Sequence, residues 1–119
     1  LRAKGKDKVI LITDSIEAAG LPDGTYKLGT QPVYVKNGEA RLANGALAGS
    51  IANMNDCVRN AFEHLGLTLN EAVNLASYNP AQSLGEPLLG EIKEGKFADI
   101  IFFDDRINIQ KTMIKGEMK

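Results

Sequence analysis

An unbroken run of apolar residues near the start of the chain predicts a strand that is buried on both faces. The run is Val9–Ile12, inside a strand expected at about residues 8–13, and such runs are typical of parallel sheets covered by helices. Asp14 follows directly. A carboxylate there would lie at the carboxyl edge of the sheet, where the catalytic residues of α/β enzymes are found. The alternative is that Asp14 only caps the turn after the strand by binding backbone N–H groups.

The next stretch alternates apolar and polar residues, which predicts half-buried antiparallel strands. Residues 25–28 and 31–36 have this pattern, and residues 39–42 would form the return strand. Asn37-Gly38 lies between the last two and is typical of a type I′ hairpin turn, which needs positive φ at both central residues. Asn44-Gly45 predicts a second tight turn.

The periodicity becomes helical at Ser50. Ser50 is a suitable N-cap and Gly66 a suitable residue just after a helix end. Thr68 and Glu71 have the spacing of a capping box, which predicts the start of a second helix. The buried face of the first helix is expected to carry Ile51, Met54, Val58, Ala61, Phe62 and Leu65.

A third short helix and two strands are expected to complete the chain. Asn79 would cap the helix with Pro80 at its first position, and the helix would stop near Gly85. Residues 97–103 and 108–114 are apolar enough to form strands.

Composition is that of an ordinary globular domain and excludes several classes of function. Of 119 residues, 44% are apolar and 24% charged, and the formal net charge is -1. Because both nucleic acid and anionic membranes call for a basic patch, neither partner is expected. The apolar runs are too short to span a bilayer. Cys57 alone cannot build a disulfide framework or a multi-thiolate metal site, so we expect a reduced, half-buried helix residue in a cytoplasmic protein.

The predicted buried strand has no second strand of its kind in the chain. A parallel strand without neighbours cannot satisfy its own backbone ladder. We therefore expect the chain to be a piece of a longer protein.

Several segments carry a family resemblance that covers essentially the whole chain. Residues 11–15, 18–24 and 47–50 resemble the carboxyl-terminal third of the N-acetylglucosamine-6-phosphate deacetylases. The closing signature of the wider amidohydrolase superfamily is similar to residues 76–81, 90–92 and 95–100.

The resemblance implies a metal-dependent (β/α)₈ hydrolase barrel with a small β-sandwich domain. Residues 1–90 would supply the last strand, a β-hairpin insertion and the final helices of the barrel, and residues 91–119 the terminal strands of the sandwich. Since a barrel takes about 250 residues, this chain cannot hold a complete one. The implied reaction converts a small amino-sugar phosphate, N-acetylglucosamine 6-phosphate, to glucosamine 6-phosphate and acetate. The isolated piece should be inactive, and the protein is expected to form homo-oligomers.

The same resemblance assigns the site residues. Asp14 matches the general acid/base, and Leu47, Ala48 and Gly49 match the segment whose backbone touches the substrate. The ligands of a divalent metal (zinc or similar), a glutamate and two histidines, would lie upstream of this chain. The chemistry is reasonable, because amide hydrolysis needs a group that takes a proton from water and returns it to the amine. The alternative for residues 47–49 is a plain loop-to-helix junction.

Other polar residues are weaker candidates. His64 lies off the apolar helical face and is interpreted as a surface residue. Asp99, Asp104 and Asp105 flank an expected strand and would terminate it rather than bind a metal. Glu17 departs from the small residues that relatives often carry there, which leaves substrate detail open.

The sequence is also compatible with two other functions. One is a different deacylase or a cyclic amidase of the same superfamily, because the closing signature alone permits either. The other is a non-catalytic small α/β interaction module.

Overall fold

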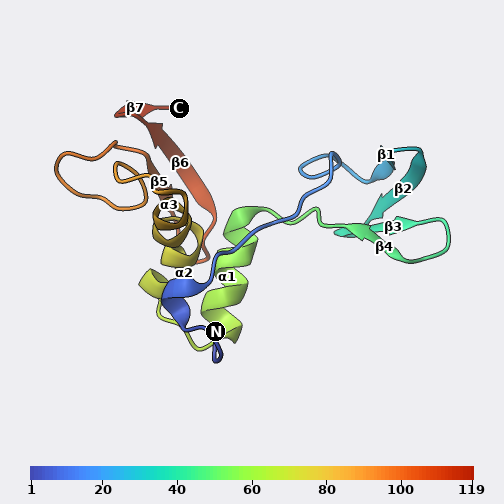
Figure 1. The fold of residues 1–119 in the computed structure, drawn as a ribbon. Helices are drawn as coiled ribbons and strands as arrows, with labels where there is room; N and C mark the ends of the chain where they lie inside the picture. Colours follow the sequence, from blue (N-terminus) through green and yellow to red (C-terminus); the bar gives the residue numbers. More distant parts are fainter. The chain divides into compact units, whose positions relative to one another are not determined.

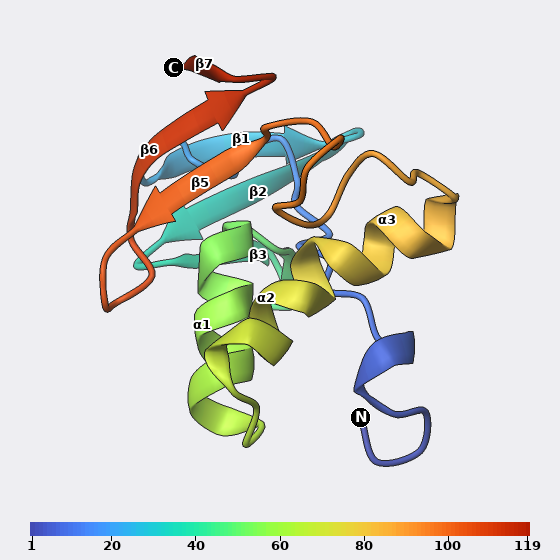
Figure 2. The same cartoon turned by 90° about the vertical axis from the view of Figure 1, so that its left-hand side faces the viewer.

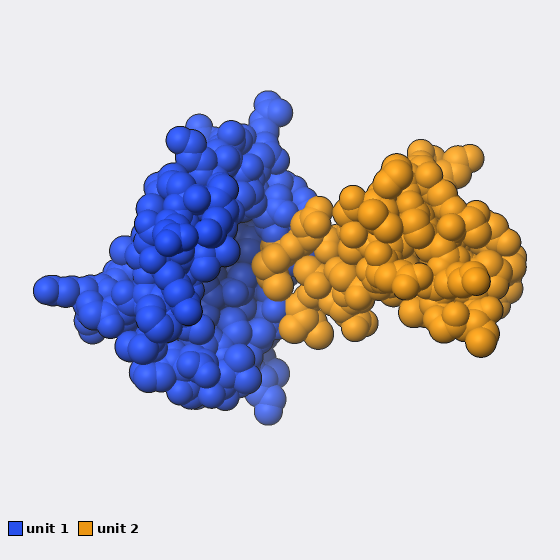
Figure 3. Space-filling model, turned by 90° about the horizontal axis from the view of Figure 1, so that it is seen from above, with its two compact units in different colours: residues 1–11, 55–119 blue, residues 12–54 orange.

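The computed structural model describes all 119 residues, and the chain forms two compact units (Figure 3). One unit contains residues 1–11 and 55–119, and the other contains residues 12–54. The fold is mixed α/β. No helix is both long enough and apolar enough to cross a membrane. The predicted division at residue 90 follows the implied parent fold and stays a prediction.

An antiparallel sheet forms the body of the unit at residues 12–54 (Figure 1). Its order is β1-β2-β3-β4. The predicted hairpin is confirmed: Val35 pairs with Ala40, and Asn37 and Gly38 have φ of 52° and 78°, as a type I′ turn requires. The strands are β1 (Gly24–Leu28), β2 (Gln31–Lys36), β3 (Glu39–Leu42) and β4 (Leu47–Gly49).

One face of this sheet carries the apolar core of the unit. Val33 and Val35 of β2 and Ala40 of β3 are buried together with Ala18, which comes from the segment before the sheet. Tyr34, between the two valines, is exposed. Burial therefore alternates along β2 with the period of two that the sequence predicted.

Helices form most of the core in the other unit, and its sheet follows them (Figure 2). The capping box between Thr68 and Glu71 is present, which confirms the predicted second helix. Gly66 and Gly85 have φ of 68° and 71° after helix ends, as expected. The helices are the short 3₁₀ helix η1 (Lys6–Lys8), α1 (Met54–His64), α2 (Leu69–Ala76) and α3 (Tyr78–Leu84).

The second sheet has the order β5-β6-β7. The predicted strand at 108–114 is confirmed as β6, but the one expected at 97–103 forms a ladder only from Ile100. The strands are β5 (Ile100–Phe103), β6 (Ile109–Ile114) and β7 (Glu117–Met118). The buried core of this unit consists of Val58, Ala61, Ala72, Leu75 and Ile107.

The prediction of a strand at residues 8–13 is wrong. The segment forms no ladder, and Ile10 and Ile12 are 39% and 73% exposed. Only one side of it is covered: Val9 and Leu11 pack against the helical core, and the Leu11 N–H donates to the Leu75 carbonyl at 2.9 Å. No other strand of the chain pairs with it, so the segment lacks both the ladder and the cover on a second side that the prediction required.

The predictions that Ser50 and Asn79 cap helices are also wrong. Ser50 lies four positions before Met54, the first residue of α1, and its Oγ accepts the Ala52 N–H at 3.1 Å. Asn79 lies inside α3, where its side-chain amide donates to the carbonyls of Lys6 at 2.8 Å and Val9 at 2.7 Å. In both cases a tertiary or turn partner competes successfully with the helix end for the polar side chain.

Two of the six residues predicted for the apolar face of the first helix are confirmed as buried. Val58 and Ala61 of α1 are almost completely covered, whereas Phe62 and Leu65 are 41% and 53% exposed. The periodicity therefore located the helix, but the residues of this chain cover only part of its apolar surface.

Candidate functional site

Asp14 is exposed and stands in an uncommon backbone conformation. Its φ is 50°, in the left-handed region that residues other than glycine rarely adopt. The carboxylate makes no hydrogen bond and no ion pair. The turn-capping alternative is therefore wrong in this structure, because capping would need N–H groups bound to that carboxylate. Aspartate tolerates this conformation better than most residues other than glycine, so the feature that stands out at Asp14 is its exposed carboxylate without a partner.

The chain just after Asp14 is joined to the chain just after β4. Ser15 and Ser50 form an isolated parallel bridge. The Ile16 N–H donates to the Ser50 carbonyl at 3.0 Å, and the Ser15 hydroxyl donates to the Ala52 carbonyl at 3.1 Å. Two segments that are far apart in sequence, one with Asp14 and one with residues 47–49, are thus held side by side.

Residues 47–49 form strand β4 at the edge of the sheet rather than a loop. Leu47 is 68% exposed, and Ala48 is half-buried against the apolar core of the unit. The register shifts between Ala40 and Arg41, where β3 pairs with β4, so the end of β4 is irregular. As an edge strand, β4 has ladder partners on one side only, which leaves backbone groups on the other side for a ligand.

Gly49 is required by both conformation and space. Its φ is 145°, and a Cβ at this position would lie 2.5 Å from Cγ2 of Ile16. Only glycine allows the end of β4 to approach the segment after Asp14 this closely.

The loop that follows Asp14 is fastened to the sheet at several points. Ala18 is fully buried in the core of the unit. The Tyr26 hydroxyl donates to the Pro22 carbonyl at 2.6 Å, and the carboxylate of Glu17 accepts the Lys27 N–H at 3.3 Å. Glu17 thus has a structural partner on β1 and does not extend freely into solvent.

The chain does not assemble a metal centre from its own residues. No group of three or more His, Cys, Asp or Glu side chains is placed to hold an ion. His64 is a surface residue, as predicted, with its side chain 69% exposed and 3.9 Å from Glu63. Asp14 is the only predicted site residue with a metal-binding side chain, and one carboxylate is not a metal site.

Two of the three acidic residues around β5, Asp99 and Asp104, have structural partners, in line with their interpretation as strand ends. Asp99 accepts the Lys115 N–H at 2.7 Å. Asp104 accepts the N–H groups of Arg106 and Asn108, both at 2.9 Å, and the Asn108 side chain at 3.0 Å. These bonds, first among them the one from the Asn108 side chain, lower the pKa of Asp104. The Asp104 carboxylate is therefore occupied in shaping the turn before β6.

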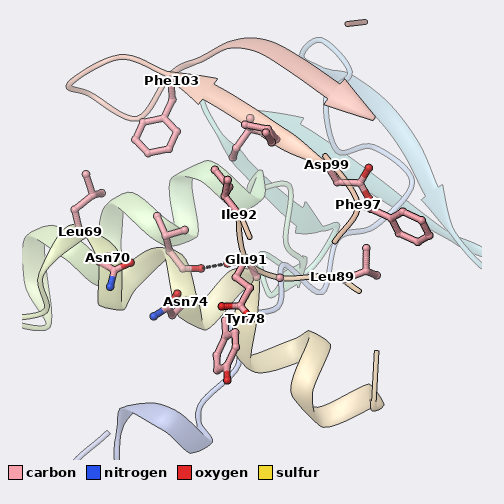
Figure 4. A pocket seen from close by; sticks show the side chains of 15 residues that line it. Leu69, Asn70, Asn74, Tyr78, Leu89, Glu91, Ile92, Phe97, Asp99 and Phe103 are labelled. Carbon is pink, nitrogen blue, oxygen red and sulfur yellow. Dashed lines mark hydrogen bonds between the residues drawn. The ribbon is translucent and has the colours of Figure 1, made fainter. Parts of the chain in front are cut away.

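A separate open cleft of about 1070 Å³ lies in the unit that contains the helices (Figure 4). It runs between α2 and β5, and Ile92 and Phe97 line it with 80% and 44% exposure. Of the two acidic residues that line it, Glu91 and Asp99, Glu91 pairs with Lys96, which lowers the pKa of Glu91. The cleft contains none of the predicted site residues, and its lining is mostly apolar.

Comparison with known proteins identifies the family. Residues 2–119 match the family described as "Amidohydrolase family". The chain belongs to the amidohydrolase family, whose members generally depend on a divalent metal.

Relatives narrow the comparison to deacetylases of amino-sugar phosphates. The chain is 42% identical over 118 residues to the N-acetylglucosamine-6-phosphate deacetylase of Lysinibacillus sphaericus, covering 99% of this chain and 30% of that one. It is 40% identical over 114 residues to the N-acetylgalactosamine-6-phosphate deacetylase of Escherichia coli O157:H7, covering 95% of this chain and 30% of that one.

A solved structure gives the same result. The chain superposes with a TM-score of 0.88 and 36% identity on a mutant N-acetyl-D-glucosamine-6-phosphate deacetylase of Mycobacterium smegmatis in complex with N-acetyl-D-glucosamine-6-phosphate. The match covers 98% of this chain and 32% of that one. The chain thus spans about a third of the length of these relatives.

Sequence reasoning missed Ile16, the residue that joins the two parts of the candidate site. The only feature of the sequence that points to Ile16 is its position two residues after Asp14. That position is not informative by itself, because an isoleucine there is equally well explained as part of the apolar core of the unit. Its contact with Gly49 depends on the fold.

Proposed function

We propose that this chain forms the part of an N-acetylhexosamine-6-phosphate deacetylase that supplies the general acid/base and one substrate-binding segment. The observation that carries the proposal is the free carboxylate of Asp14, held beside residues 47–49 by the bridge between Ser15 and Ser50. Relatives that share about 40% of its residues are named for this reaction.

In the proposed reaction, Asp14 takes a proton from the attacking water. The water oxygen bonds to the acetyl carbon, the C–N bond breaks, and the proton passes from Asp14 to the amine that leaves. The products are acetate and the free amino sugar phosphate. A carboxylate suits both steps when it is ionised before attack and open to the substrate, and Asp14 is exposed and unpaired.

Residues 47–49 would contact the substrate through their backbone. Gly49 has no side chain to block approach, and β4 is an edge strand with a free side. The N–H and C=O groups along that side can bind the polar groups of a sugar without a charged side chain.

The metal ion that this family generally uses does not fit the residues present, as no ligand cluster forms among them. We place its ligands outside this chain and derive no step through it. For the same reason we expect the isolated chain to be inactive, and we interpret it as the last barrel strand, final helices and terminal sandwich strands of the complete enzyme.

A second substrate is favoured by a specific observation. Two relatives with nearly the same identity to this chain, 42% and 40%, are named as deacetylases of N-acetylglucosamine 6-phosphate and of N-acetylgalactosamine 6-phosphate, respectively. The two sugars differ only in the orientation of one hydroxyl group, so the same acid and the same segment can serve either substrate.

The test is hydrolysis of both acetylated sugar phosphates by the complete gene product, beside its Asp14→Asn variant and the isolated 119-residue chain. We expect turnover of at least one substrate and a loss of about 10²- to 10⁴-fold in kcat for Asp14→Asn. Asp105→Asn, which alters another exposed carboxylate, is the matched control. No hydrolysis of either sugar, or unchanged kcat in Asp14→Asn, would overturn the proposal.

A further inference from the structure

We propose that Ile16 is a positioning residue that sets the place of Asp14 relative to residues 47–49. The inference rests on the proposed function and deepens it, because it names the residue through which the acid and the substrate-binding segment are coupled.

Ile16 is held from two directions. Its backbone N–H donates to the Ser50 carbonyl at 3.0 Å, one residue beyond β4. Its side chain is half-buried and packs against the buried core of the unit, and its Cγ2 lies where a side chain on Gly49 would begin. The isoleucine therefore fills the space that Gly49 leaves open.

The Asp14 side chain has no such support of its own. Its carboxylate makes no hydrogen bond or ion pair, so its position depends on the backbone around it. That backbone is attached to the end of β4 through Ser15 and Ile16 only. Because Ile16 is the one of these two with a side chain packed against Gly49, it decides how closely the two segments approach.

The expected consequence concerns rate more than binding. If the methyl branch facing Gly49 is removed, the segment with Asp14 can shift toward β4, and a misplacement of about 1 Å can cost up to about 10²-fold in rate. Residues 47–49 stay in the sheet, so contacts made by their backbone are largely kept.

The experiment compares Ile16→Ala, Ile16→Val and Leu42→Ala in the complete gene product. Valine keeps both branches at Cβ, including the methyl group facing Gly49. Leu42 packs against the same core but does not touch Gly49 in the way that Ile16 does, so it is the matched control for loss of apolar contact. We expect Ile16→Ala to lower kcat about 10- to 100-fold with KM changed less than threefold. Ile16→Val should stay within about threefold of the parent kcat, and Leu42→Ala should lower only the melting temperature.

A second measurement separates this inference from the proposed function. Amide hydrogen exchange of the residue 16 N–H reports its hydrogen bond to the Ser50 carbonyl, and the three-bond HN–Hα coupling of Asp14 reports φ at that residue. Both can be measured whether or not the enzyme turns over. In Ile16→Ala we expect faster exchange and an altered coupling, and neither change in Leu42→Ala. If Ile16→Ala leaves both signals and kcat unchanged, the positioning role is wrong. If the parent shows no deacetylation but the signals change as expected, the proposed function fails while the structural coupling stands.

Discussion

Gly49 and Ile16 meet so closely that a Cβ on Gly49 would lie 2.5 Å from Cγ2 of Ile16. Real Cβ atoms do not approach another carbon to this distance, and φ of 145° at residue 49 adds a conformational requirement for glycine. The contact joins β4 to the segment that carries Asp14. It is therefore the point at which the candidate site is most sensitive to a small change.

Gly49→Ala should reduce the free energy of unfolding by about 2–3 kcal/mol, because it adds both a clash and backbone strain. Gly45→Ala is the matched control: its φ is 83°, but a Cβ there would meet nothing within 4 Å. Strain alone should cost that variant about 1 kcal/mol. Urea denaturation of both variants measures the difference, and equal losses would contradict the close contact.

Asp14→Asn should leave the free energy of unfolding within about 0.5 kcal/mol of the parent value. The carboxylate has no partner to lose, and asparagine tolerates the left-handed conformation at φ of 50°. Asp14→Val should instead cost about 1–2 kcal/mol, since a β-branched residue is strained there. Thermal melts of the two variants test this, and a large loss in Asp14→Asn would show a hidden partner for the carboxylate.

Asn79→Ala should destabilise the chain by about 2–3 kcal/mol. The change removes two hydrogen bonds, to the carbonyls of Lys6 and Val9, from a site that is 7% exposed. The Lys6 carbonyl keeps the Val9 N–H at 3.5 Å, whereas the Val9 carbonyl loses its side-chain partner. Asn70→Ala, an exposed asparagine on α2, should stay within about 0.5 kcal/mol. Chemical denaturation measures both, and hydrogen exchange should show residues 6–9 opening first in Asn79→Ala.

The Lys6–Glu71 pair predicts a pH dependence of stability at the acid end. The hydrogen bond from Lys6, followed by those from Thr68, lowers the pKa of Glu71 from 4.5 to about 2. A carboxyl group with a lowered folded-state pKa stabilises fully above its unfolded value, and the effect is lost as the pH falls from about 4.5 to about 2. Glu71→Gln should remove this part of the slope.

The measurement is the melting temperature of the parent and of Glu71→Gln across that pH range. Glu63→Gln is the control, because the carboxylate of Glu63 lies 3.9 Å from His64 and has no closer ionic partner. The parent and Glu71→Gln curves should converge toward pH 2. Parallel curves would mean that Glu71 titrates normally.

Local features were predictable because their physical causes lie within a few residues. Asn37-Gly38 specifies a type I′ turn through its φ requirement, and the alternation in β2 follows from the period of a strand. Thr68 and Glu71 satisfy each other across one helical turn. None of these depends on what lies beyond the element.

Asp14 was also a candidate from sequence, from its place after an apolar run and from the family resemblance. Its conformation and its free carboxylate were not predictable. The bridge from Ser15 to Ser50, which holds the segment after Asp14 beside the end of β4, was not predictable either, because it forms only once the sheet has brought residue 50 back.

The sequence by itself determined the turns, the capping box of α2, the glycines that follow helix ends and the presence of an acidic residue beside an apolar segment, since those follow from backbone preferences and periodicity. Only the tertiary structure decided that Val9–Ile12 is covered on one side, that Asn79 binds the segment at residues 6–9 instead of capping a helix, and that Ile16 fits against Gly49. Such outcomes depend on which distant groups compete for the same space and the same hydrogen bonds, and residue order does not specify that competition until the chain has folded.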